Sequence, residues 1–419
     1  MALPPPLPDH SRGLTIAQLI LSILGMLLSL AGIILLIFLS LAQTWMGDLD
    51  PSQTAQILSI AWIVVLTIAL SVPSLVLSIR RLRGLVSRSA SPRSFLFASL
   101  CLLLIPLLIF IGRQAVEQQA PAWLIAPLTI LLVMIPVWWF VTLGMFKLNG
   151  GSLQRLWGLS SFSIYLTLPL VFLVEIIVLG FGILAAFFWL IQQPEFAPLL
   201  QQIQNQALID PLAIMNLDFD FLPLIQRPGV IFSAIIGVAV VVPLIEELLK
   251  PLGLWFLIKK EPSPAEGFVA GLVCGASFAL LESALSLSAA PADNWVVTVA
   301  GRAGTSLLHI VTAGLNGWAL AASWRDGKAI RIGAIYIFTV ILHGLWNFFA
   351  VLMGIGQVGV EFAVSVDPLL TQSASWVLAG LALLLLIVLV FMNRKLRIAA
   401  LPPPIPSTAF PPIPPGVME

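Results

Sequence analysis

Ionisable side chains lie inside segments of this sequence that otherwise suit the interior of a membrane. Glu246, Glu247 and Lys250 fall within the run "VVPLIEELLKPLGLWF", residues 241–256. A charged side chain at the centre of a bilayer costs roughly 2.5–3.5 kcal/mol on insertion scales. Such residues are rare within membrane helices and usually serve a function. The group therefore indicates a functional site.

The next three apolar runs carry further polar groups. They are Glu282, then Arg302 and His309, then His343 and Asn347. If each run is a helix with about 1.5 Å of rise per residue, Glu282 and the two histidines reach a depth similar to that of Glu246. We therefore expect four successive helices to bring these side chains into one layer of the membrane.

Spacing within single helices predicts how these groups support one another. Glu246 and Glu247 point about 100° apart on a helix, so one can face a cavity while the other contacts a neighbouring helix. Lys250 follows them at i+4 and i+3, which allows an ion pair within the helix. His343 and Asn347 share one helix face, so the amide can orient the imidazole or hold a reacting oxygen. Lys250 and Asn347 are thus predicted to be supporting residues.

Two imidazoles beside buried carboxylates are suited to two kinds of chemistry. They match the ligand set of a catalytic zinc site, in which three protein ligands leave a position open for water. The same groups could instead activate water without a metal, with a glutamate as general base and the histidines donating hydrogen bonds to an oxyanion. In both arrangements water attacks a carbonyl carbon.

Composition predicts the elements that must position these residues. Of the 419 residues, 59% are hydrophobic and 9% are charged, whereas a soluble domain carries roughly 25% charged residues. About ten apolar runs reach the length of roughly 20 residues that a membrane helix needs. They cover residues 15–43, 56–79, 94–112, 122–146, 158–192, 230–258, 265–290, 295–323, 330–354 and 373–392. We expect an all-α, polytopic bundle in the lipid bilayer.

Charges in the loops predict its orientation. Basic residues cluster after every second run, at Arg80–Arg93, Lys147 and Arg155, Lys259 and Lys260, Arg325–Arg331, and Arg394–Arg397. The alternate loops are mainly acidic, and Lys and Arg gather on the cytoplasmic side of membranes. Both termini should therefore be cytoplasmic. The chain has a net charge of only +1. Nucleic-acid binding requires a broad basic surface, so no nucleic-acid partner is expected.

The apolar runs divide the chain into segments. We predict a disordered proline-rich tail at 1–14, membrane helices of unassigned role at 15–192, an external loop at 193–228, a catalytic bundle at 229–355, a loop and final membrane helix at 356–393, and a basic then proline-rich cytoplasmic tail at 394–419. Proline-rich tails favour polyproline II, which leaves open a partner that binds proline motifs.

Four ordered motifs resemble a known family. "EELLK" (246–250), "FALLE" (278–282), His309 and "HGLWN" (343–347) resemble the PrsW family of intramembrane proteases, relatives of the CAAX prenyl proteases and bacteriocin-processing enzymes. The resemblance covers about 229–355. The wider superfamily often has arginine after the paired glutamates and histidine at the end of the second motif. Lys250 and Glu282 stand at those positions here, so the use of a metal remains open.

The resemblance implies an endopeptidase that cuts membrane-anchored proteins with a metal-bound or glutamate-activated water. It implies that the catalytic residues are Glu246, Glu247, Glu282, His309 and His343. Glu282 would then be a metal ligand or a protonated hydrogen-bond partner. The predicted ligands of a divalent metal, with zinc as first candidate, are His309, His343 and Glu282. The alternative is a proton- or ion-coupled transporter, because buried Glu and His chains also form proton relays.

Overall fold

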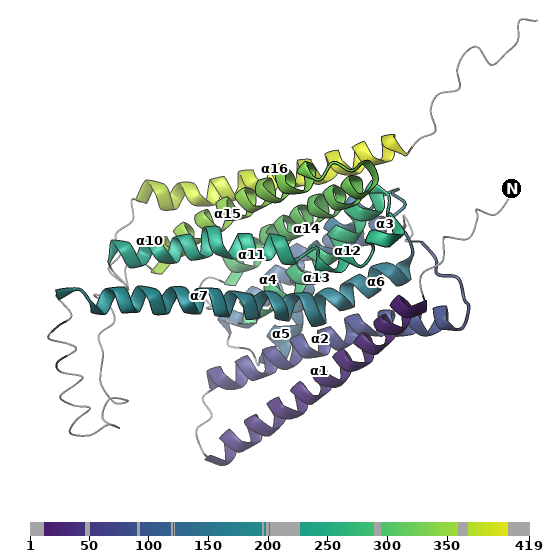
Figure 1. Ribbon diagram of the computed structural model, residues 1–419. Coiled ribbons are helices and arrows are strands. Elements are labelled where there is room, and N and C mark those ends of the chain that lie inside the picture. Colours follow the sequence, from purple (N-terminus) through teal and green to yellow (C-terminus); the bar gives the residue numbers. More distant parts are fainter. Residues whose placement is uncertain are drawn as a thin grey trace, which may run out of the picture.

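The computed structural model describes residues 12–46, 51–89, 93–118, 120, 122–194, 197, 201, 227–288, 295–358 and 368–400. These residues form a bundle of helices and contain no β-strand (Figure 1). Nine of the described helices are long and apolar enough to cross a membrane, and a tenth span results if the bent pair Ser94–Leu102 and Ile105–Glu117 counts as one. The predicted all-α bundle of about ten spans is confirmed. Most of the two predicted tails and most of the loop predicted at 193–228 lie outside the described residues, while residues 12–14 belong to α1 and 394–399 to α16.

The helices follow one another in the order of the predicted apolar runs. They are α1 (Arg12–Met46), α2 (Pro51–Leu82), α3 (Arg93–Leu102), α4 (Ile105–Glu117), α5 (Ala122–Gly144), α6 (Leu153–Phe162), η1 (Ser163–Thr167), α7 (Leu168–Ile191), α10 (Pro228–Ile236), η4 (Gly237–Val241), α11 (Val242–Leu249), α12 (Leu252–Trp255), η5 (Ile258–Lys260), α13 (Pro264–Ser288), α14 (Trp295–Asp326), α15 (Ile330–Val358) and α16 (Pro368–Ala399). Helices α1 and α2 lie side by side at one edge, and α16 lies at the opposite edge (Figure 1).

Two spans contain a short π-helical segment directly before an X-Pro pair. Segment η1 precedes Pro169, and η4 precedes Pro243. Proline has no backbone N–H, so a carbonyl oxygen one turn earlier in the helix loses its usual hydrogen-bond donor. The hydrogen bonds of the helix change from the α to the π pattern in that turn. In the overlong span Leu153–Trp189, this register change is how the chain passes Pro169.

Small residues bring α13 and α14 into close contact. Gly267, Gly271 and Gly275 recur every fourth residue, and a methyl group at any of them would overlap a carbonyl oxygen of α14. Such small-residue faces let membrane helices approach closely. The carbonyl that faces Gly275 belongs to His309. The contact therefore fixes the position of His309 against α13.

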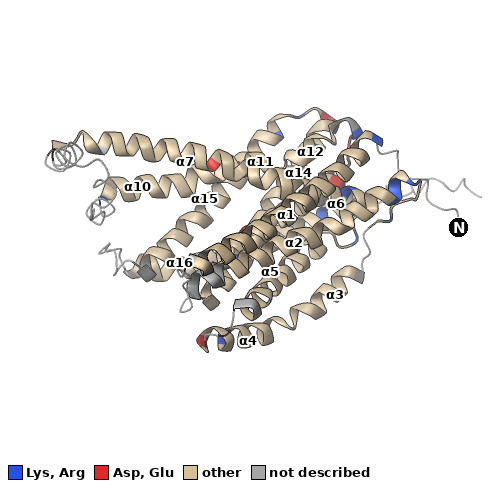
Figure 2. Ribbon diagram, turned by 90° about the horizontal axis from the view of Figure 1, so that it is seen from below, with Lys and Arg blue, Asp and Glu red and all other residues tan. Residues whose placement is uncertain are grey.

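Charged residues are unevenly placed along the bundle. Most Lys and Arg residues lie at the end where the N-terminus emerges (Figure 2). This distribution agrees with the alternation of basic loops in the sequence. The cytoplasmic placement of that end stays a prediction.

Candidate active site

Glu247 is a fully buried carboxylate that is held by hydrogen bonds on both oxygens. Its Oε1 accepts from Lys250 Nζ at 2.9 Å and from the Thr312 hydroxyl at 3.1 Å, and it lies 2.9 Å from Nδ1 of His343. Its Oε2 accepts from the Asn316 amide at 3.2 Å. A carboxylate with these partners is fixed in place and orients the His343 ring through Nδ1. Glu247 thus contacts neighbouring helices, while its neighbour Glu246 lines a cavity.

Lys250 supplies the positive charge at the centre of the cluster. Its side chain has no exposed surface, and its Nζ lies 2.7 Å from Glu246 Oε2 and 2.9 Å from Glu247 Oε1. It also lies 2.5 Å from Nδ1 of His309. The ammonium therefore has one acceptor for each of its three N–H groups. The predicted pairing of Lys250 with the two glutamates is present in the structure.

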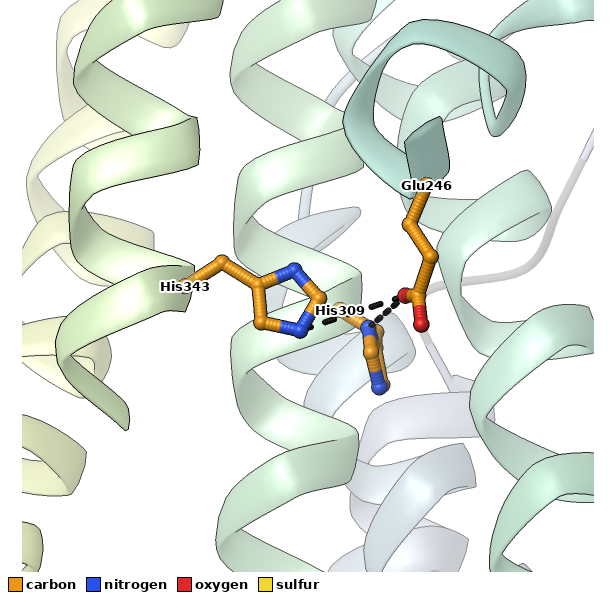
Figure 3. Close-up of side chains that lie close together, drawn as sticks. All are labelled: Glu246, His309 and His343. Atoms are coloured by element: carbon orange, nitrogen blue, oxygen red, sulfur yellow. Dashed lines mark ion pairs between the residues drawn. The ribbon is translucent and has the colours of Figure 1, made fainter. Parts of the chain in front are cut away.

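Glu246, His309 and His343 converge from three helices, α11, α14 and α15 (Figure 3). One possible ligand atom from each residue lies within 4.8 Å of the others, and all three residues are buried. Glu246 Oε2 is 3.7 Å from Nδ1 of His309 and 3.9 Å from Nε2 of His343. Glu246 Oε2 is buried, and the cation that compensates it in this structure is the Lys250 ammonium at 2.7 Å. An unsatisfied buried oxygen is unfavourable unless a cation or a ligand compensates it.

Glu282 lies on the far side of His309 from Glu246. Its Oε2 is 2.7 Å from Nε2 of His309, and its Oε1 is 3.0 Å from the Arg302 guanidinium. Arg302 thus pairs inside the bundle. The geometry groups Glu246, in place of Glu282, with the two histidines as possible metal ligands. Glu282 takes the position of a carboxylate that orients a histidine through its second nitrogen.

These residues line one side of a cavity of 430 Å³. Glu175 of α7 contributes to its wall, and the Glu175 carboxyl interacts electrostatically with Glu246 and Glu282. Glu175 is not part of the sequence motifs. The signal that could have identified it as a functional residue is its position as a carboxylate within an apolar run. Val238 also lines the cavity and is 39% exposed. An apolar side chain of the cavity wall is therefore partly exposed at the surface of the protein.

Asn347 lines the same cavity but does not bond His343 in this structure. Its amide donates to the carbonyl oxygen of Val238 at 3.0 Å. The Val242 N–H donates to the Gly237 carbonyl in the i+5 pattern of a π-helix. In the same pattern the donor for the Val238 carbonyl would be residue 243, which is a proline and has no N–H. Asn347 replaces that missing donor. Its role is therefore to hold η4 against α15, a contact that Gly344 allows by its lack of a side chain.

The Asn347→Ala variant should lower the free energy of unfolding by about 1–3 kcal/mol, because it leaves the Val238 carbonyl without a donor. Pro243→Ala supplies a backbone N–H at the position that the carbonyl lacks. The loss caused by Asn347→Ala should therefore be smaller in the Pro243→Ala background, as measured by thermal unfolding in detergent micelles. Equal losses in both backgrounds would refute this role for Asn347.

The motifs did not include three polar residues that support Glu247. Thr312 and Asn316 lie at i+3 and i+7 from His309, on the same face of α14, and Thr339 donates to the Asn316 side chain. This helical spacing of polar residues was the available signal. Together they show that the buried carboxylate has a dedicated set of donors.

A bundle of membrane-spanning helices with a buried carboxylate and two histidines at a cavity defines the class of protein: an integral, multi-pass membrane enzyme with a candidate metal centre. Residues 172–373 match the sequence model of the PrsW family of intramembrane metalloproteases. No curated protein and no solved structure matches this chain.

The family match contains every residue of the site described above. It begins at Phe172 in α7 and ends at Ser373 in α16, so it includes Glu175 as well as the region around Glu246 and the histidines. The resemblance to the PrsW family and the prediction of an intramembrane protease are confirmed. The relation to CAAX prenyl proteases and bacteriocin-processing enzymes stays a prediction.

Proposed function

We propose that this protein hydrolyses peptide bonds of membrane-anchored proteins, using a divalent metal held by Glu246, His309 and His343. The observation that carries the proposal is the convergence of these three buried side chains within 4.8 Å. Two nitrogens and one oxygen from three residues are the donor set of a catalytic zinc site. Zinc is therefore our first candidate for the metal.

The surroundings of the three residues fit a metal in two further ways. Each histidine has its other ring nitrogen next to a carboxylate, Glu247 for His343 and Glu282 for His309. This arrangement is usual for metal-binding histidines, because it fixes the tautomer and the ring orientation. Lys250 contacts two of the same donors, Glu246 and His309. These donors thus converge on a cation, and metal binding through Nδ1 of His309 requires Lys250 to give up that contact.

Charge balance also favours a divalent cation. Four carboxylates, those of Glu175, Glu246, Glu247 and Glu282, interact with one another and with Lys250 around the site, and Arg302 pairs with Glu282. With neutral histidines the two cations leave one negative charge in excess from Glu246, Glu247 and Glu282, and a second one when Glu175 is ionised. Uncompensated charges at membrane depth are strongly unfavourable. A divalent metal would neutralise that excess.

The protein's own residues would position the reaction in the following way. A divalent metal bound here acts as a Lewis acid, which polarises the scissile carbonyl and makes water more acidic. Glu247 and Glu282 hold the two imidazoles in their orientations. The cavity, with Val238, Phe172 and Trp346 among its lining residues, supplies an apolar wall for a substrate segment. The partly exposed Val238 in this wall suits a substrate that arrives from the bilayer.

The experiment that tests this function is cleavage of a membrane-anchored reporter protein by the purified enzyme in proteoliposomes. We expect the wild-type protein to release a fragment. Ion flux across the same vesicles should be measured in parallel. Absence of cleavage together with a pH-dependent flux would favour the transporter alternative, which the family match does not support.

Glu282→Gln should weaken metal binding by about 10–100-fold, because residues that orient a metal-binding histidine contribute that much to affinity. The affinity can be measured by competition with a coloured chelator. Glu266→Gln is a matched control, since Glu266 lies on the same helix, is equally exposed at 23% and also pairs with an arginine. Equal metal affinity in Glu282→Gln and wild type would contradict this role of Glu282.

A further inference from the structure

A second cavity lies away from the active site, at the end of the bundle where basic residues gather (Figure 2). It has a volume of 1020 Å³. Four cationic residues line it: Lys147 after α5, Arg325 near the end of α14, and Arg394 and Arg397 near the end of α16. The start of α13, at Ser263–Ala265, forms another part of the wall. In the part of the chain that the structure describes, none of the residues that line the cavity is acidic.

The position of these cations is fixed by a buried contact between helices. The Asn393 amide donates to the carbonyl oxygens of Gly144 at 2.8 Å and of Phe146 at 2.9 Å. This contact ties the end of α16 to the end of α5, so Arg394 and Lys147 come to the same cavity. Arg397 also has a buried Nε without a hydrogen-bond partner within the described residues. The helix ends that form this cavity are therefore held in place, and the Arg397 Nε–H is a buried donor that a ligand could use.

Two acidic residues close to the lining residues in sequence are already paired with other cations. Glu266 lies 2.7 Å from Arg155, and Asp326 lies 2.7 Å from Arg331. Within the part of the chain that the structure describes, none of the four lining cations pairs with a carboxylate. Three helix C-termini and one helix N-terminus contribute roughly half a charge each, which leaves a positive charge of roughly +3. Among the described residues, the cavity thus has no carboxylate to balance these cations.

We propose that this cavity binds a phosphate-bearing anion at the membrane surface. Arginine side chains present paired N–H donors that match the oxygens of a phosphate group. Basic pockets between the ends of membrane helices are suited to the headgroups of anionic lipids, and a soluble phosphate compound offers the same chemistry. The proposal concerns a site separate from the candidate active site and does not depend on proteolysis.

The binding test uses purified protein in nanodiscs of zwitterionic phosphatidylcholine, with phosphatidylglycerol or pyrophosphate as the added anion. Native mass spectrometry measures retained lipid, and thermal unfolding measures the effect of pyrophosphate. The test variant Arg325→Gln/Arg394→Gln/Arg397→Gln should bind the anion on the order of 100-fold more weakly than wild type, at roughly fivefold for each basic side chain. The single variant Arg394→Gln should lose roughly fivefold by the same reasoning, and it covers the case in which the triple variant does not fold.

The matched control is Arg80→Gln/Arg83→Gln/Arg88→Gln, which removes three exposed arginines elsewhere. It should keep wild-type anion binding. Selective retention of phosphatidylglycerol that only the cavity variants lose identifies a lipid headgroup as the ligand. Stabilisation by pyrophosphate that only the cavity variants lose identifies a soluble phosphate compound. Equal losses in the cavity and control variants, or no binding of either anion by wild type, would overturn the proposal.

Discussion

Glu246→Gln should reduce kcat for cleavage of a membrane-anchored substrate by more than about 100-fold, because it removes a proposed metal ligand and even the loss of an outer orienting residue lowers activity by 10–100-fold. Gln keeps the size of the side chain and removes its charge. The variant therefore tests the chemistry of Glu246 and leaves the packing around α11 largely intact. The measurement is the initial rate of fragment release in proteoliposomes, with thermal unfolding as a check that the protein is folded.

Two comparisons make this result specific. Glu117→Gln changes the same residue type at an exposed ion pair, whose Glu117 side chain is 49% exposed, and should keep the wild-type rate. Glu246→Gln/Glu247→Gln should be scarcely slower than Glu246→Gln, because groups that act as a unit have non-additive effects. Wild-type turnover by Glu246→Gln would remove Glu246 from the mechanism.

His309→Ala and His343→Ala should each lower metal affinity by more than about 100-fold, since even the loss of an outer orienting residue lowers it by 10–100-fold. Each substitution removes one of the three proposed donors, and both should also abolish cleavage. Metal content of the purified variants can be measured by elemental analysis after dialysis against a weak chelator.

The chain offers a direct control for these substitutions. It has three histidines, and the third, His10, lies in the tail outside the described residues. His10→Ala should keep both the metal and the activity of wild type. If His309→Ala and His343→Ala bind metal as tightly as His10→Ala, these histidines are not metal ligands.

The sequence predicted the fold class well, because long apolar runs and basic loops are strong signals for membrane helices. It also predicted that Glu246, Glu282, His309 and His343 would meet, and in the structure they do. Depth along each helix was sufficient for this inference. The path of the overlong run at 158–192 could not be predicted in this way. A π-helical segment and a kink at Pro169 would both give the same uninterrupted apolar sequence, so the pattern cannot distinguish them.

The division of roles among the site residues was less accessible from the sequence. Which carboxylate joins the histidines depends on how α11 and α13 are rotated about their axes, and neighbouring helices determine that rotation. The resemblance to the family favoured Glu282 as a ligand, whereas the geometry favours Glu246. Asn347 was expected to orient His343 or to hold a reacting oxygen, but the missing N–H of Pro243 gives its amide a different partner, the carbonyl of Val238. Glu175 reaches the cavity from a helix that carries no motif.

The most direct test of the metal-dependent mechanism is the cleavage rate of one purified preparation before metal removal, after metal removal and after addition of zinc. The mechanism predicts that cleavage is lost with the metal and returns when about one zinc ion per chain is restored. Glu246→Gln should stay inactive in all three states. Full cleavage by metal-free wild-type protein would contradict the metal centre and would favour a glutamate acting on water without a metal.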